Sequence, residues 1–286
     1  PHFLKSKNIS NILVQSSILA IIAVGETIVI MTGGNELSVS SVVPFTSLSS
    51  AFMIADLRLP IGVWNYDALV CRGLIGLING VIISYGRVPS FITTLGMMSI
   101  ARGGALALKG GQPISGIPPG YEMLATTELF GVIPIFILYT IVIYLLGYLF
   151  LEKTKGGRYI YAIGGNRDSA RLSGVKVKVY ETLAYVICGL LAGVGGILLT
   201  ARLDYATPIA GIGYELDVIA ATVIGGTSLA GGEGFIFGTL LGAVMIGTLR
   251  NGLTLLNVSA YYQQIIIGMV IIGAVFIDRI KAFKGD

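Results

Sequence analysis

Three carboxylates lie within or at the edge of strongly apolar stretches of the chain: Glu26, Glu36 and Asp217. Because a charged group that faces lipid is costly, each is expected to face a bundle interior, a cavity or the membrane surface. There a carboxylate can carry a proton or a sodium ion, line a polar path for a solute, or only accept structural hydrogen bonds. Glu26 lies deepest in its apolar stretch, which favours a lining role. For Glu36 and Asp217 the functional and structural roles are equally favoured.

Amide side chains accompany these carboxylates in the apolar part of the sequence. Asn79, Asn251 and Gln263 lie in or beside apolar stretches, where an amide can hydrogen-bond either a neighbouring helix or the hydroxyl groups of a sugar. Bonding between helices is the commoner use. We group these three amides with the three carboxylates as path candidates, the residues that a polar translocation path would use.

Residue sets for covalent or metal-dependent catalysis do not occur in the sequence. The one histidine is His2, which excludes a zinc site of several histidines, and there is no Gly-x-Ser-x-Gly motif. The glycine-rich run Gly225–Gly234 lacks the Lys-Ser/Thr pair of a phosphate-binding loop. Cys71 and Cys188 are far apart and lack a Cys-x-x-Cys spacing. We therefore expect no enzyme activity, cofactor, metal or disulfide.

Composition places the chain among proteins that cross a membrane several times. Hydrophobic residues make up 54% of the 286 residues and charged residues only 12%, too few for the surface of a soluble protein of this length. The chain also holds 40 glycines. Small residues let membrane helices approach closely, and Gly189 and Gly193, or Gly238 and Gly242, share a helix face. We expect an all-α polytopic membrane protein, with one transmembrane domain over residues 1–286.

Nine membrane spans are predicted if about 20 apolar residues make one crossing. They are Asn11–Met31, Leu37–Ala55, Ala68–Tyr85, Phe91–Leu108, Leu129–Leu151, Tyr180–Ala201, Leu216–Leu229, Phe235–Leu249 and Tyr261–Ile277. The span from Leu216 is short and interrupted by glycine, so a broken or re-entrant helix is the alternative there. A further span before Pro1, making ten, would place Lys5 and Lys7 in the cytoplasm, as the positive-inside rule prefers.

A basic loop at about residues 152–179 separates the fifth and sixth predicted spans. Between Lys153 and Lys178 its charges are Lys153, Lys155, Arg158, Arg167, Arg171, Lys176 and Lys178, against Asp168. Because Lys and Arg resist translocation, the loop is expected in the cytoplasm. Asn166 can cap a short helix through its side-chain oxygen, and Gly174 can end it in a left-handed conformation. These signals predict two helical turns on the cytoplasmic face.

Two parts of the chain resemble each other faintly. GGNELSVSSV followed by GLIGLINGVII, in the first half, is similar to GYELDVIAATV followed by GTLLGAVMIGTLRNGL in the second. Internal duplication is common in transporters, with the substrate path at the interface between the repeats. The composition that all membrane helices share explains the similarity equally well.

Over essentially its whole length the chain resembles the permease subunits of bacterial ATP-binding-cassette sugar importers, of the ribose-type branch. The most specific runs are PSFITTLGMMSIARGGALALKGGQPISG, GRYIYAIGGNRDSARLSGVKV, GYELDVIAATVIGGTSLAGGEG and LRNGLTLLNVSAYYQQIIIG. Glu26, Asn35 and Arg250 depart from the family pattern. The resemblance implies a multi-pass protein of the bacterial inner membrane that passes a monosaccharide, with ribose favoured, by alternating access. It also implies three partners: a cytoplasmic ATPase, a sugar-binding protein outside the cell and a second permease copy.

The resemblance further implies that Gly164 to Gly174 is a coupling helix that seats in a groove of the ATPase. Its coupling residues are Gly164, Gly165, Asn166, Arg167, Asp168, Ala170, Arg171 and Gly174. Arg167 and Arg171 fall on one helix face, where both would be available to acidic groups of the ATPase. Two alternatives stay open. One is a branched-chain amino acid permease of the same architecture, and the other is an ion-coupled secondary transporter that uses the buried carboxylates.

Overall fold

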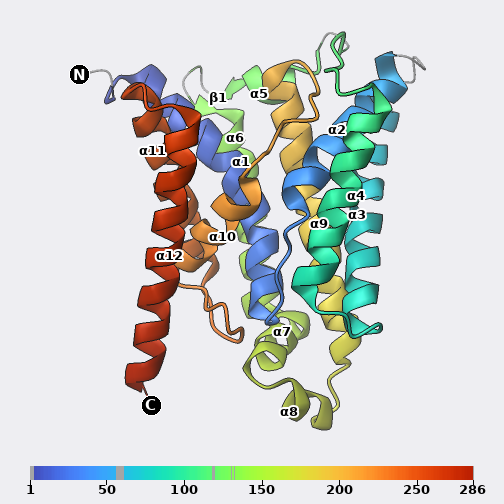
Figure 1. The fold of residues 1–286 in the computed structure, drawn as a ribbon, viewed down its shortest axis with the longest axis vertical. Coiled ribbons are helices and arrows are strands. Elements are labelled where there is room, and N and C mark those ends of the chain that lie inside the picture. Colours follow the sequence, from blue (N-terminus) through green and yellow to red (C-terminus); the bar gives the residue numbers. More distant parts are fainter. Residues whose placement is uncertain (1–2, 56–60, 118–119, 130, 132, 286) are drawn as a thin grey trace.

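The computed structural model describes residues 3–55, 61–117, 120–129, 131 and 133–285 (Figure 1). His2 therefore lies outside the described residues. The helices are α1 (Ser6–Met31), α2 (Val39–Ala55), α3 (Ile61–Ser84), α4 (Ser90–Leu108), α5 (Met123–Thr126), α6 (Ile135–Tyr148), α7 (Lys155–Gly165), α8 (Arg167–Leu172), α9 (Val177–Leu203), α10 (Tyr214–Ile224), α11 (Ile236–Leu255) and α12 (Ala260–Gly285). A π-helical turn, Leu149–Lys153, extends α6, and the two-residue strands β1 (Glu128–Leu129) and β2 (Ile133–Pro134) pair antiparallel.

Five of the described helices are long and apolar enough to cross a membrane: α1, α4, α6 with its π-helical turn, α9 and α11. Shorter apolar segments lie within α2, α3 and α12. The chain is thus a helical membrane protein, as its composition predicts. In Figure 1 the amino terminus lies at one end of the bundle, while α7, α8 and the carboxyl terminus lie at the other.

Helix α1 is the centre of the bundle. It packs against α6, α9, α10 and α11, and an unbroken run of its residues from Ser16 to Met31 is buried. The neighbouring helices, and not lipid, therefore cover this part of α1. Glu26 lies within this run, so its carboxylate is enclosed by the bundle and does not face lipid.

Glycines set the close packing of α3 against α9. A Cβ atom on Gly80 would lie 2.8 Å from the Cα atom of Thr182, and one on Gly189 would overlap the carbonyl oxygen of Arg72. A Cβ atom on Gly242 of α11 would likewise overlap the backbone of α10. The prediction that the glycines of α9 and α11 serve helix packing is confirmed at these positions.

Two helices, α2 and α10, are each preceded by a non-helical segment, and the two units run in opposite directions in Figure 1. The chain turns back from the end of α1 through residues 32–38 and then forms α2, which contains Pro44. After α9 the chain enters the bundle through residues 204–213 and then forms α10, which has 11 residues. These segments carry the two similar sequence runs, and an inverted arrangement of this kind supports an internal repeat.

Three sequence predictions need correction. The span expected from Leu129 begins with the β1–β2 hairpin, and its helix starts only at Ile135. The span expected over Leu216–Leu229 is the 11-residue helix α10, which ends at Ile224 and is too short for a crossing of about 30 Å at 1.5 Å per residue. The broken-helix alternative therefore describes this segment. The basic loop contains a second helix, α7, which is not among the predicted elements although its first residue follows an N-cap threonine, Thr154.

Candidate coupling surface and buried polar residues

Helix α8 begins and ends as its sequence predicts. The Asn166 side-chain oxygen accepts a hydrogen bond from the backbone N–H of Ser169 at 2.8 Å, which satisfies one of the free donors of the first turn. Gly174 has a φ of +85°, and its N–H donates to the carbonyl of Arg171 at 3.0 Å. The helix is six residues long, slightly less than the two turns expected. Together with α7 it forms the layer at the end of the bundle where the carboxyl terminus also lies (Figure 1).

The two faces of α8 differ in chemistry. On the inner face, Ala170 is buried in a small apolar cluster with Ile163 of α7 and Val177 of α9. On the outer face, Leu172 is 84% exposed, and Arg171 and Asp168 lie beside it as an exposed pair 3.4 Å apart. An exposed leucine of this kind offers apolar surface that a partner could bury. We call Asp168, Arg171 and Leu172 the outer face of α8.

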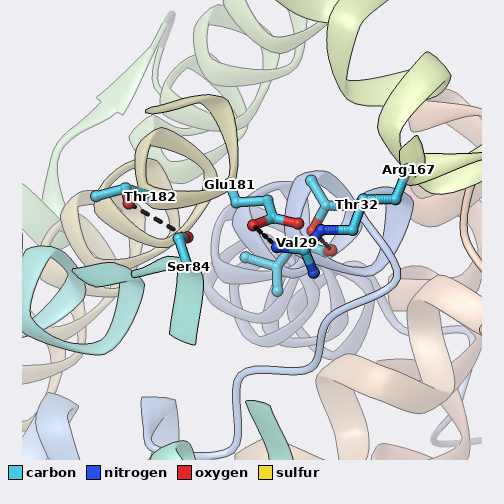
Figure 2. A network of polar contacts seen from close by, with 6 residues as sticks. All are labelled: Val29, Thr32, Ser84, Arg167, Glu181 and Thr182. Carbon is cyan, nitrogen blue, oxygen red and sulfur yellow. Dashed lines mark hydrogen bonds and ion pairs between the residues drawn. The ribbon is translucent and has the colours of Figure 1, made fainter. Parts of the chain in front are cut away.

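Arg167 is used differently from Arg171, although the two share the spacing of one helix face. Its Nη2 atom donates to Oε2 of Glu181, in the second turn of α9, at 2.7 Å (Figure 2). The side chain of Glu181 is only 6% exposed. Arg167 is therefore engaged within the chain and is not freely available to a partner, in contrast to the expectation from its spacing.

A glycine junction joins this layer to the bundle. It consists of Gly33, Gly164, Gly231 and Gly232, from three distant parts of the chain. The N–H of Gly232 donates to the carbonyl oxygen of Met31 at 3.0 Å, and a Cβ atom on Gly231 would lie 2.8 Å from the nitrogen of Gly33. Glycine is required here, since Gly231 and Gly232 have positive φ angles and backbones meet without intervening side chains.

Tyr161 of α7 contacts the loop between α10 and α11, which also carries Gly231 and Gly232. Its hydroxyl oxygen lies 3.1 Å from the carbonyl oxygen of Gly234 and 3.1 Å from Oε1 of Glu152. Burial, and then the hydrogen bond to Glu152, raises the pKa of Tyr161 to about 12. The hydroxyl therefore stays protonated at neutral pH and can donate one hydrogen bond.

An open cavity of about 580 Å³ lies between α8, the first turns of α9 and the α3–α4 turn. The end of α1 forms another part of its wall, at Thr32 and Gly33. Arg87, Arg171 and Lys178 line it together with the Arg167–Glu181 pair. On α8 it is lined by Arg167, Asp168 and Arg171, so this side of the helix, unlike the side of Ala170, is not packed against the bundle.

Glu26, Glu36 and Asn79 form a buried polar cluster beside the α3–α9 contact. Oε1 of Glu36 accepts hydrogen bonds from the N–H of Ser38 at 2.9 Å and from its hydroxyl at 2.5 Å, while Oε2 accepts from Nδ2 of Asn79 at 2.9 Å. The N–H of Glu36 in turn donates to Oε1 of Glu26 at 3.1 Å. The structure thus brings three of the six path candidates together.

The other path candidates lie elsewhere. Asp217 of α10 and Arg250 of α11 form a two-pronged ion pair, with Oδ1 2.8 Å from Nη2 and Oδ2 2.7 Å from Nε. Asn251 exchanges hydrogen bonds with Asn8 of α1 at 2.9 and 3.0 Å. Gln263 donates to the backbone just before α12. The helix-bonding interpretation therefore describes Asn251, and Arg250, which departs from the family pattern, is the partner of Asp217.

Arg72 of α3 is fully buried, and it is not among the path candidates. Its guanidinium donates to the carbonyl oxygens of Val43 at 2.8 Å and Ala192 at 2.6 Å, to that of Gly193, and to the hydroxyl of Thr46. These acceptors come from α2 and α9, so one side chain joins three helices. A lone arginine within an apolar stretch is the signal that the sequence offers for this role.

Comparisons with known proteins agree over nearly the whole chain. The family described as "Branched-chain amino acid transport system / permease component" matches residues 8–275. The ribose import permease protein RbsC of Escherichia coli strain K12 is 44% identical over 287 residues, which cover 98% of this chain and 88% of that protein.

More distant sugar permeases match over a similar extent. RbsC of Bacillus subtilis is 42% identical over 288 residues, covering 99% of this chain and 88% of that protein. The D-allose transport system permease protein AlsC of Escherichia coli is 35% identical over 279 residues, covering 98% and 85%. No solved structure matches the chain.

Proposed function

Since the chain belongs to the family of permease components of branched-chain amino acid type transport systems, we propose that it is the membrane subunit of an ATP-driven sugar importer. The observation that carries this proposal is its 44% identity, over 98% of its length, to a ribose import permease. Permeases named for D-allose and for galactose are less similar, at 35% and 37% identity. Ribose is therefore the favoured solute. The chain is a multi-pass protein of the bacterial plasma membrane.

The importer requires subunits that this chain does not supply. A cytoplasmic ATPase provides the energy, because the sequence has no phosphate-binding loop of its own. A sugar-binding protein delivers the solute from outside, and a second copy of the permease completes the membrane unit. The loop of residues 152–179 faces the cytoplasm, and its helix α8 docks on the ATPase through the outer face of α8. Gly164, Gly165 and Asn166 position that helix.

Alternating access is the proposed mechanism of translocation. Closure of the ATPase pair draws the α8 helices together and rocks the bundle, so that a sugar released outside passes between the permeases. In this arrangement the chain crosses the membrane nine times, with α10 and the extended segment before it making one broken crossing. The cluster of Glu26, Glu36 and Asn79 is connected to α9 through the contact of Tyr185 with the carbonyl oxygen of Asn35. No covalent step is required.

Reconstitution tests the function directly. The permease, with the ATPase and the binding protein encoded with it, is placed in liposomes, and uptake of radiolabelled ribose is measured with ATP inside. We expect uptake that requires both ATP and the binding protein, and that excess ribose suppresses more than D-allose, D-galactose or leucine does. Leucine uptake instead of sugar uptake would identify an amino acid permease. Uptake by the permease alone under an ion gradient would identify a secondary transporter.

A further inference from the structure

We propose that the Arg167–Glu181 ion pair is the joint that transmits movement of the coupling helix α8 to the membrane helix α9. This inference rests on the proposed function, since it assigns a positioning role within an ATP-driven importer. Arg167 then acts inside the chain, whereas the exposed Asp168, Arg171 and Leu172 bind the ATPase. Two neighbouring arginines thus have separate tasks.

The two side chains of the pair differ in exposure to water. Its carboxylate is nearly buried, with 6% of the side chain exposed, and Arg167 lies 2.7 Å away with 54% of its side chain exposed. Arg167 is the cation that the described part of the chain places in contact with this carboxylate. A buried charge that loses its partner is strongly destabilised, so α9 follows α8 when α8 is displaced. Charge-assisted hydrogen bonds of this length are among the stronger polar contacts in proteins.

Two further links join α8 to α9, a small apolar contact and a short covalent connection. Ala170 touches Val177 through a small apolar cluster, and the chain between the helices spans only residues 173–176. The open cavity of about 580 Å³ beside the pair leaves much of α8 unpacked. To these links the ion pair adds a polar side-chain contact that fixes the orientation of α8 relative to α9.

From Glu181 the movement has a packed route into the membrane. The next residue, Thr182, donates a hydrogen bond to the hydroxyl of Ser84 on α3 at 3.3 Å (Figure 2), and Gly80 of α3 packs directly on the backbone of Thr182. One turn further along α9, the hydroxyl of Tyr185 lies 3.5 Å from the carbonyl oxygen of Asn35. Asn35 precedes Glu36 of the buried polar cluster. A shift of this part of α9 therefore reaches α3 and the segment that carries Glu36.

The test uses the complete transporter in liposomes, with permease, ATPase and binding protein. Variants Arg167→Gln and Glu181→Gln each break the pair, and Arg167→Glu with Glu181→Arg restores it with the charges exchanged. Arg158→Gln on α7 removes one exposed charge from the same loop and serves as the matched control. Three quantities are measured: ATPase retained on purification, ATP hydrolysis stimulated by the binding protein, and ribose taken up per ATP.

We expect the two single variants to retain the ATPase, and to lose about fivefold or more of both the stimulation and the uptake per ATP. The exchanged pair recovers most of the loss, and Arg158→Gln behaves as wild type. Loss of ATPase binding in Arg167→Gln would overturn the joint and make Arg167 a docking residue. The proposal would also be overturned if both single variants kept the stimulation of ATP hydrolysis and the uptake per ATP of wild type. It would likewise be overturned if the variant with exchanged charges formed an intact complex but recovered neither quantity.

Failure of the proposed function has a different signature. In that case the wild-type complex takes up no sugar, whereas stimulation of ATP hydrolysis still reports whether the joint couples the subunits. A variant that does not fold is recognised by its loss of yield, and the exchanged pair then decides the question.

Discussion

Replacing Leu172 by alanine is expected to weaken binding of the ATPase without disturbing the permease. The side chain is 84% exposed at the end of α8, so its removal leaves no cavity inside the chain. Burying an exposed leucine side chain contributes about 1.5–3 kcal/mol. Since each 1.4 kcal/mol changes an equilibrium constant about tenfold, the variant should raise the Kd for the ATPase by about 10- to 100-fold.

The assay is a direct binding measurement with the permease held in nanodiscs and the isolated ATPase in solution. Leu256→Ala is the matched control, because Leu256 is 75% exposed and follows α11 at the end of the bundle opposite α8 (Figure 1). It should bind the ATPase as wild type does. Thermal unfolding of both variants should match wild type. A Kd for Leu172→Ala within about twofold of wild type, with normal folding, would refute the assignment of the outer face of α8 as the docking surface.

Three further outcomes are expected. Arg250→Gln leaves the buried carboxylate of Asp217 without its cation. The loss of folding free energy should be somewhat less than the roughly 3–5 kcal/mol of a fully buried pair and should appear as a lower Tm in detergent. Adding Asp217→Asn should recover part of the lost stability. Gly80→Ala should lower the Tm by forcing α3 from α9, at about 1–3 kcal/mol, whereas Gly96→Ala, which meets open space, should not. A tyrosine whose pKa is raised from 10.0 to about 12 stabilises the fold below pH 10 and loses this contribution as pH rises toward 12; Tyr161→Phe should reduce the steepness of alkaline unfolding, and an unchanged profile would contradict this.

Features set by local chemistry were predictable from the sequence. The helix start at Asn166 and the helix end at Gly174 each depend on a contact with a residue within one turn, and both predictions are confirmed. The spans that become α1, α4 and α9 were also located to within a few residues, because the length of an apolar run directly reflects the thickness of the membrane. Such signals need no knowledge of what packs against them.

Features set by distant contacts were not predictable. Helix α7 has no apolar run. Its Thr154 cap is as local as that of Asn166, but its other supports, the contact of Tyr161 with Gly234 and the burial of Ile160 and Ile163, depend on the folded chain. Arg167 has the spacing of a docking residue, yet its orientation is decided by Glu181, in the next helix. The untested part of the site, the solute path itself, stays a prediction.

The arginine that joins three helices has a consequence for biogenesis. Translocon insertion of an arginine at the centre of a helix costs about 2.5–3.5 kcal/mol, and Arg72 finds its carbonyl acceptors Ala192 and Gly193 only on α9. When α3 leaves the ribosome, α9 has not yet been made. During synthesis α3 is therefore expected to stay beside α2 at the translocon, or to be only partly inserted in the bilayer. It inserts fully when α9 has been made and packs against the guanidinium of Arg72. The order in which the helices enter the membrane is thus constrained by one side chain.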